Sequence, residues 1–422
     1  MLQTWRKLNE FEKIFTLTNE ACQFAIETEK SSFLPTLINN IKKSMVGFNL
    51  KMQGDDLVYT NQDIPIYPLP KSIRTCQDAA IFIDENYPIN FTKALCNLAA
   101  NENIVVVNAT HMIYDGGFFV DMFPRLYNQT DDENYLQLQS PRKIPLTPHD
   151  LFPTEFTNKN MKTLVDRHFD DMHHIPYVRR SKEIDPTINI ECNCKSHSYE
   201  TPATDYQFLH NKMGLTDMYW SFIPLNLMAL DGKMQTPDFG ILCCVDLRQL
   251  MNKKKINRLV CENFTEINLA IKDIKPNFTV RQVGKLMRDR FNIMKKDGSL
   301  FASFVAMHEG FPDAGPILLS EMSNIGRFDL KPPVVDCWIQ QTMKSKYGGS
   351  LASFSMFSRN KHGVNTLVTR FQQAPTVFND LDSKILSRSV VHSMKEIPVD
   401  ITIQQAYDEI RSFQSKVRAN KI

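Results

Sequence analysis

The clearest hydrophobic pattern in the chain surrounds a histidine in its first third. An apolar, β-branched run at residues 104–110 ends in His111, and Asp115 and two glycines follow before an amphipathic run at residues 118–127. This order predicts a strand, a tight turn and a helix. A histidine at the end of a strand is held on a rigid element. A neutral imidazole there can take a proton from an alcohol or an amine near pH 7.

Weaker patterns predict further elements. Strands are expected at residues 11–17, 351–359 and 364–371, and helices at residues 32–46, 213–230 and 403–417. The last two strands flank Asn360-Lys361-His362-Gly363, which predicts a hairpin. In the final helix, apolar residues recur at three- and four-residue steps and form one face. Core packing and reversible docking on a lipid surface both remain open for that face.

The composition is that of an ordinary globular protein. Its 49 basic and 47 acidic residues leave a net charge of +2, so no global electrostatic attraction to nucleic acid is expected. The chain has no run of 18 apolar residues and no apolar leader, which predicts neither a membrane-spanning helix nor a signal peptide. Nine scattered cysteines indicate reduced thiols. We therefore expect an intracellular protein, in the cytoplasm or peripherally on the endoplasmic reticulum or lipid droplets.

A change in composition divides the chain. Prolines gather between residues 140 and 202, where regular periodicity is poor, and this predicts a junction between two units, residues 1–180 and residues 181–422. The same stretch holds His168, His173, His174, Cys192, Cys194 and His197. A zinc site is the alternative to solvated loop side chains, but Cys192 and Cys194 are closer together than in common structural zinc sites. We therefore expect no metal.

Two segments of the second unit carry candidate chemistry. An apolar run ends in V-D-L-R, with Asp246 and Arg248, and predicts a strand that finishes at these residues. Ser323, Asn324 and Gly326 belong to an S-N-x-G segment. An ordinary strand-end turn is the alternative to a binding element there, because Ser, Asn and Gly are common turn residues.

The three segments together resemble the chloramphenicol-acetyltransferase-like superfamily, which includes peptide-synthetase condensation domains and fungal alcohol acetyltransferases. H-x-x-x-D-G from His111 to Gly116, then V-D-L-R, then S-N-x-G stand in the family's order. The resemblance covers nearly the whole chain. Fungal alcohol O-acetyltransferases look nearest, and a related fungal N-acetyltransferase of sphingosine-like long-chain amines is a close second. The motifs do not separate these two.

The resemblance implies an α/β fold of the α+β sandwich type, with two chloramphenicol-acetyltransferase-like domains, mixed sheets flanked by helices, and a tunnel between them. It implies that His111 is the general base, that Gly116 belongs to the catalytic motif, and that Asp115 is structural and pairs with Arg248. A turn or helix N-cap is the alternative role for Asp115. The residues expected along the passage of the acyl donor are Ser323, Asn324 and Gly326.

The implied activity is transfer of an acetyl or short acyl group from coenzyme A to a hydrophobic alcohol or long-chain amine, by direct attack without an acyl-enzyme. Acetyl-coenzyme A is then a co-substrate, and no cofactor is bound permanently. We expect a monomer that meets a small hydrophobic acceptor and no nucleic acid. Lys253-Lys254-Lys255 is either a solvated helix start or a contact for coenzyme A phosphates or a membrane. The alternative functions are a non-catalytic ligand-binding protein of this fold and a condensation-type domain using carrier-bound acyl groups.

Overall fold

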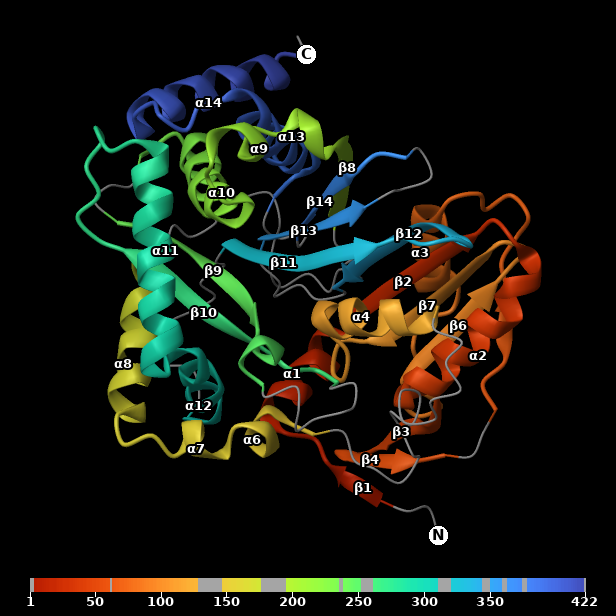
Figure 1. Ribbon diagram of the computed structural model, residues 1–422. Helices are drawn as coiled ribbons and strands as arrows, with labels where there is room; N and C mark the ends of the chain where they lie inside the picture. Colours follow the sequence, from red (N-terminus) through yellow and green to blue (C-terminus); the bar gives the residue numbers. More distant parts are fainter. Residues whose placement is uncertain are drawn as a thin grey trace.

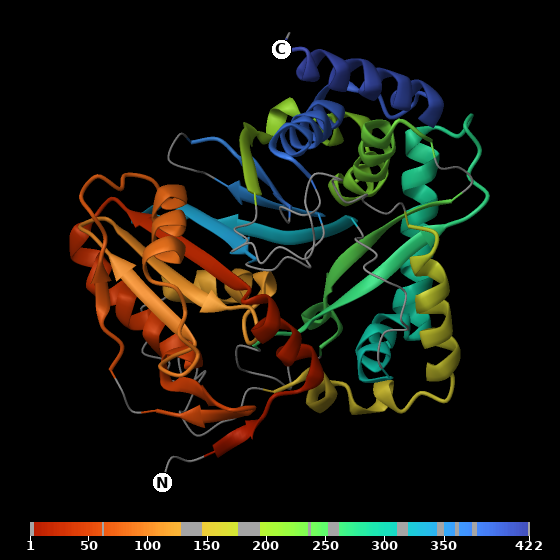
Figure 2. The same cartoon turned by 180° about the vertical axis from the view of Figure 1, so that it is seen from behind.

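The computed structural model consists of two halves, each a β-sheet with helices packed against it (Figure 1). The structure describes residues 4–60, 63–127, 146–175, 195–234, 238–251, 261–309, 320–343, 350–358, 363–373 and 378–420. The first half is red to orange in Figure 1 and the second is green to blue. The two lie side by side in both views (Figure 2). The expected α/β architecture of two sheet-and-helix units is confirmed.

The first half is built on a five-stranded sheet. Its strand order is β12 (Val334–Thr342), β2 (Ala21–Thr28), β7 (Ile104–Thr110), β6 (Cys96–Ala100) and β5 (Ile66–Pro68). Its helices are α2 (Leu34–Ser44), α3 (Cys76–Asn86) and α4 (Gly116–Met122), and a small second sheet joins β1 (Thr4–Lys7), β4 (Asp56–Tyr59) and β3 (Leu50–Gln53). Strand β7 is buried along its whole length, as its continuous apolar run predicts.

The second half is built on a six-stranded mixed sheet. Its strand order is β10 (Phe264–Ile271), β9 (Phe239–Asp246), β11 (Ser320–Asp329), β13 (Ser350–Ser358), β14 (Thr366–Gln373) and β8 (Lys195–Pro202). The long helices are α8 (Met161–Met172), α10 (Leu215–Asp231), α11 (Val280–Asp297), α12 (Ala302–Glu309), α13 (Asp380–Glu396) and α14 (Ile403–Arg418), and the short ones are α6 (Pro148–Leu151), α7 (Pro153–Phe156) and α9 (Phe208–Asn211). Strand β11 runs parallel to both of its neighbours. Helices α8, α10, α11 and α13 contact strands of this sheet, and α4 of the first half contacts β11.

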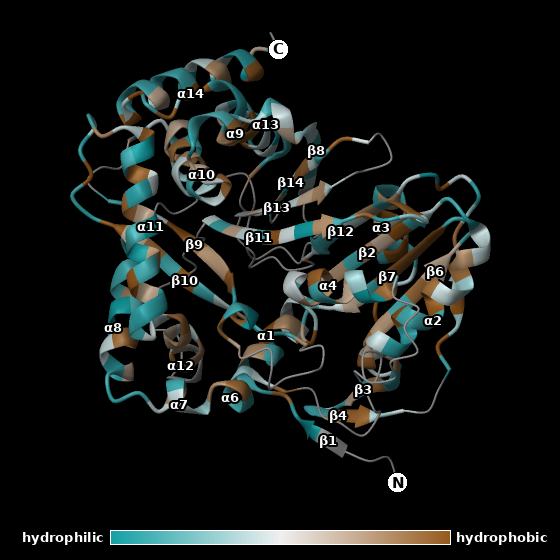
Figure 3. Ribbon diagram, viewed as in Figure 1, coloured by the Kyte–Doolittle hydropathy of each residue, from teal (hydrophilic) through white to brown (hydrophobic). Residues whose placement is uncertain are grey.

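Several expected elements are confirmed. Strands β13 and β14 form the antiparallel hairpin, and α14 buries Ile403, Ala406, Ile410 and Val417 on one face. That face packs on α10 and α13, so core packing rather than docking explains it. The helix expected at residues 213–230 is α10, but it is buried on nearly every side instead of being amphipathic. In Figure 3 the outer helices α11 and α14 carry much hydrophilic colour, whereas β9 is mostly hydrophobic.

The segment expected as a strand at residues 11–17 is a helix, so this prediction was wrong. Helix α1 (Glu10–Thr18) begins after Asn9, whose side chain accepts a 2.8 Å hydrogen bond from the Glu12 amide. Glu12 returns a bond to the Asn9 amide, which completes a capping box. Phe11 and Phe15 then share a buried face at a helical spacing. The cap and this spacing therefore favour a helix over the expected strand.

The two halves exchange elements. Strand β12 belongs to the second half in sequence, yet it pairs antiparallel with β2 along its whole length and completes the first sheet. Helix α8 precedes the second half in sequence, yet it packs against β10 and α12. The boundary expected near residue 180 falls within residues 176–194, outside the described residues.

Candidate active site

The histidine segment adopts the strand, turn and helix that its pattern predicts. Strand β7 ends at Thr110, His111 follows, and α4 begins at Gly116. The His111 amide donates to the Glu20 carbonyl at 2.9 Å, which fixes the start of the turn to the residue before β2. Asp115 is the N-cap of α4, and its Oδ1 accepts from the Phe118 amide at 2.7 Å. The imidazole therefore stands on a buried strand and a capped helix.

The His111 ring is held between aromatic side chains and an acid. Phe15 stacks on it at 4.6 Å between centroids, and Phe264 meets it edge-on at 5.3 Å. On the inner side, Nδ1 lies 3.4 Å from Oε1 of Glu262. Neither of these two atoms has a hydrogen-bond partner among the described residues, so the contact is a close approach of two buried groups. Burial raises the pKa of Glu262 well above its usual range, and the nearby carboxyls of Glu12 and Asp115 raise it further.

Asp115 and Arg248 form a buried ion pair between the halves. Arg248 Nη2 lies 2.9 Å from Asp115 Oδ1, and both side chains are almost fully buried. The Asn263 amide also donates to Asp115 Oδ2 at 2.6 Å, while Arg248 Nη1 donates to Asp246 Oδ1 at 2.9 Å. Burial alone would lower the pKa of Arg248, but Asp115 and Asp246 raise it above its usual value, so the guanidinium stays charged. The Asp115 carboxylate therefore caps α4 and also pairs with Arg248, so both of the roles considered for it are observed.

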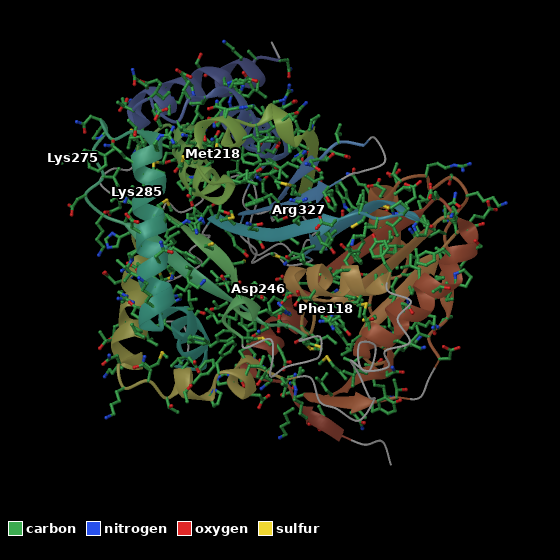
Figure 4. All side chains as sticks on the ribbon, viewed as in Figure 1. Phe118, Met218, Asp246, Lys275, Lys285 and Arg327 are labelled. Atoms are coloured by element: carbon green, nitrogen blue, oxygen red, sulfur yellow. The ribbon has the colours of Figure 1, made fainter. Side chains whose placement is uncertain are left out.

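The second glycine of the motif lies against this ion pair. A Cβ on Gly117 would come 2.6 Å from Arg248 Nη1 and 2.9 Å from Asp246 Oδ2. A Cβ on Gly116 would meet only the side chain of Ile325, at 3.0 Å. Figure 4 labels Phe118 on α4 and Asp246 at the end of β9, and these two elements meet at the junction of the halves. Gly117 therefore lets α4 approach the end of β9.

The S-N-x-G segment is a bulge inside strand β11, not a turn at its end. The register of β11 against β13 shifts between Asn324 and Gly326. Gly326 has φ +115°, in the region that favours glycine, and it faces Val120 of α4. The bulged residue, Ile325, projects onto Gly116. The bulge thus shapes the surface opposite the histidine motif. The amide of Asn324 is exposed and donates to Thr216 Oγ1 at 3.1 Å.

One cavity brings the predicted residues together. It has a volume of about 510 Å³ and lies where the first half meets the sheet of the second half. His111, Asp115 and Gly116 border it from the first half. Ser323, Asn324, Gly326 and Arg248 border it from the second half. Phe11, Ile14, Phe15, Ile339 and Met343 supply apolar wall. This size and mixture of surfaces suit a small, largely apolar ligand.

Sequence reasoning missed several residues of this site. Glu262 carries no recognisable motif, because its place beside His111 depends on how the chain enters β10. Glu266 and Glu321 line the cavity. Their sequence signal is an acid inside an apolar strand, which is unusual for a partly buried position. Gly117 could have been found as the second glycine after Asp115.

Some predictions fall outside the described residues. Lys253-Lys254-Lys255, Cys192 and Cys194 belong to residues whose structure is not described. Of the histidines near the junction, His168 is buried and contacts Asn268, and burial lowers its pKa to about 4. None of the helices among the described residues has both the length and the apolar character required to cross a membrane.

No family model matches the chain, and no curated protein matches it. Several solved structures are similar to it in fold. Polyketide synthase associated protein 5 from Mycobacterium tuberculosis aligns over 100% of both chains with 13% identity and a TM-score of 0.63. A mutant starter condensation domain of rhizomide synthetase RzmA in complex with C8-CoA aligns over 95% of this chain and 97% of that one, with 12% identity and a TM-score of 0.63. The first condensation domain of the calcium-dependent antibiotic synthetase, in complex with a substrate analogue, aligns over 96% and 98%, with 11% identity and a TM-score of 0.63. The chain has the condensation-domain fold.

Proposed function

We propose that this protein transfers a short acyl group from a coenzyme A thioester to a small hydrophobic alcohol or amine, with His111 as the general base. The observation that carries the proposal is the shared cavity, which places His111 opposite Ser323 and Gly326. These residues lie more than 200 positions apart, and the fold gives them one surface. A base beside a cavity with apolar walls suits acyl transfer, because apolar walls limit the access of water.

His111 takes the proton of the acceptor as its oxygen or nitrogen attacks the thioester carbonyl. Nδ1 is turned inward to Glu262, so Nε2 is the ring nitrogen left for the acceptor. Burial raises the pKa of Glu262, but the positive ring that forms 3.4 Å away favours its carboxylate form, and that carboxylate in turn stabilises the imidazolium. The proton then passes from His111 to the departing thiolate. Asp115 has no part in this transfer, since its oxygens are engaged by Phe118, Arg248 and Asn263.

A condensation-type reaction with a carrier-bound acyl group is the second candidate. Two structural neighbours are condensation domains, and one of them is described in complex with C8-CoA. The same cavity would then receive the pantetheine arm of a carrier protein instead of coenzyme A. A fungal alcohol acetyltransferase remains the finer form of the first candidate, on the strength of the three sequence motifs.

The experiment is a product screen with a thioester donor. Wild type and His111→Ala are incubated with acetyl-coenzyme A and a mixture of hydrophobic alcohols and amines. Free thiol and acetylated products are followed by mass spectrometry. We expect thiol release and one class of product from wild type and little from His111→Ala. Turnover only with an acyl-carrier thioester would favour the condensation reaction. Tight acyl-coenzyme A binding without any turnover would favour a ligand-binding protein.

A further inference from the structure

A row of polar side chains crosses the sheet below the cavity. Glu266 of β10 pairs with Cys244 of β9, Cys244 pairs with Ser323 of β11, and Ser323 pairs with Ser353 of β13. Residues directly opposite one another in a sheet share a face, and neighbouring strands lie about 4.8 Å apart. All four residues border the cavity. The cavity floor is therefore a polar stripe under an apolar wall.

Glu321 lies two residues before Ser323 on β11 and adds a second acid to Glu266 on this face of the sheet. None of the other described residues of the stripe carries a positive charge. The ligand atoms of Cys244, Glu266 and Glu321 all lie within 4.8 Å of one another. Cys244 Sγ donates to Glu321 Oε1 at 2.8 Å, and Glu266 has no hydrogen-bond or ion-pair partner among the described residues. Arg248 is the only lysine or arginine among the described residues that border the cavity, and it is bound to Asp115 and Asp246. The floor can therefore accept a positive group from a ligand.

A buried hydroxyl faces the same space. Ser353 is 6% exposed and borders the cavity. Its hydroxyl has no hydrogen-bond partner among the described residues. Because Ser353 borders the cavity, a ligand or water there can supply the missing hydrogen bond. This is independent of the acids, and it points to a ligand that carries hydrogen-bonding groups at the floor.

The acids also repel one another when no cation is present. Burial, together with the nearby Glu20 carboxyl, raises the pKa of Glu321 to about 7. Burial and the carboxyls of Glu321 and Glu20 raise the pKa of Glu266 well above its usual range. The amide of Gln341 stabilises Glu20 at 2.6 Å but brings no charge. A bound cation would relieve this repulsion and favour the ionised carboxylates.

We propose that the acceptor is a primary alkylamine, which enters as its ammonium ion and binds between Glu266 and Glu321. This inference rests on the proposed acyl transfer and chooses between its two acceptor classes. An ammonium offers three N–H donors and a positive charge, whereas an alcohol offers one donor and no charge. The alkyl chain lies along the apolar wall formed by Phe11, Ile14 and Ile339.

The floor is close enough to His111 for the reaction. Phe264 touches the imidazole edge-on, and Glu266 is the next residue on the same face of β10. Residues two apart on a strand are separated by about 7 Å. An amine at Glu266 therefore lies within a short movement of both the base and a thioester held above it.

The protons and bonds balance as follows. The ammonium gives one proton to a carboxylate of the Glu266–Glu321 pair, and its lone pair forms a C–N bond with the thioester carbonyl. His111 takes a second proton from nitrogen. The C–S bond then breaks, and the thiolate receives that proton from His111. The products are an N-alkyl amide and free coenzyme A thiol, with one proton released from the carboxyl pair to solvent.

The experiment compares octylamine with 1-octanol, two acceptors of equal chain length, in wild type, Glu266→Gln and Glu321→Gln. Glu409→Gln, on the exposed face of α14, is the matched control. Acetyl-coenzyme A is the donor, and thiol release gives kcat and KM for each acceptor. We expect wild type to prefer octylamine. Each cavity variant should raise KM for octylamine by about tenfold, the effect of losing about 1.4 kcal/mol of charge attraction, and should raise KM for 1-octanol less, because an alcohol carries no charge.

Equal or better turnover of 1-octanol, with no effect of Glu266→Gln on octylamine, would overturn the amine proposal and leave acyl transfer intact. If neither acceptor is turned over, acyl transfer fails. Calorimetric titration with octylamine then still decides whether the acidic floor binds an ammonium, since binding lost in Glu266→Gln supports it and unchanged binding overturns it. Titration with zinc chloride completes the test. Zinc binding that needs Cys244, without any preference for octylamine, would make the floor a metal site and overturn the proposal.

Discussion

Asp115 and Arg248 lie 133 positions apart in the sequence, and their side chains meet at 2.9 Å in a buried ion pair between the two halves. Asp115 also caps α4, so the turn that carries His111 is tied to the end of β9 by one carboxylate. The position of the imidazole relative to the second half therefore depends on this pair.

Replacement of Asp115 by Asn should destabilise the protein strongly. The change leaves Arg248 buried and charged with one partner fewer, and loss of one partner of a buried pair typically costs about 3–5 kcal/mol. The measurement is the free energy of unfolding by denaturant. Asp289→Asn breaks the exposed Lys285–Asp289 pair of α11 and is the control, with an expected loss below about 1 kcal/mol. Similar losses in both variants would contradict a structural role for Asp115.

Replacement of His111 by Ala should lower turnover by about 10²–10⁴-fold, because a positioned general base is removed. His210→Ala, at an exposed position of α9, provides the control and should keep full activity. Circular dichroism checks that both variants fold. Turnover of His111→Ala within about twofold of wild type would exclude the base role.

Replacement of Glu262 by Gln tests whether this residue positions His111. The amide keeps the size of the side chain but cannot become the carboxylate that stabilises the imidazolium, so kcat should fall while KM changes little. An unchanged kcat with a lower melting temperature would give Glu262 a purely structural role.

Alanine at Gly117 should be far more damaging than alanine at Gly116. The new Cβ at Gly117 meets the guanidinium of Arg248, which is locked by two carboxylates, whereas at Gly116 it meets the flexible side chain of Ile325. We expect a lower melting temperature and lower activity for Gly117→Ala. Gly116→Ala should change acyl-donor selectivity more than stability. Greater damage from Gly116→Ala than from Gly117→Ala would show that α4 does not need to lie this close to Arg248.

Stability should depend on pH through Glu321. Its pKa is raised to about 7 by burial, whereas an unfolded glutamate titrates near 4.3. The folded state therefore holds the proton more tightly than the unfolded state, and stability from this group falls as pH rises from about 4.3 to about 7. Glu321→Gln removes this dependence, so its melting temperature relative to wild type should increase across that window. A constant difference in melting temperature between Glu321→Gln and wild type from about pH 4.5 to about pH 7.5 would refute this role of Glu321.

The sequence predicted the parts of the site that are local. Strand β7, the turn at His111 and α4 follow one another within a few residues, and their pattern is strong. The strand expected at residues 11–17 is helix α1, because the capping box of Asn9 and Glu12 begins a helix whose buried residues have helical spacing. The fold class followed from the resemblance of three motifs, in their order, to the chloramphenicol-acetyltransferase-like superfamily.

The acidic floor was beyond the sequence for a physical reason. Glu266, Cys244 and Glu321 come together through the register of β9 with β10 and of β9 with β11, and a shift of one residue would turn every side chain to the other face. Strand register is set by packing across the whole sheet. The bulge at Ile325 likewise cannot be read from S-N-x-G, which is also a common turn sequence.

Strand β12 has a consequence for any attempt to produce the halves separately. A polypeptide that stops before residue 194 would lack the strand that covers β2, and the free backbone groups of β2 would form an apolar edge. Such edges pair with other chains and cause aggregation. The first half should therefore be insoluble alone, and co-expression with the second half should restore a folded complex. The cavity beside His111 would then form only when both fragments meet.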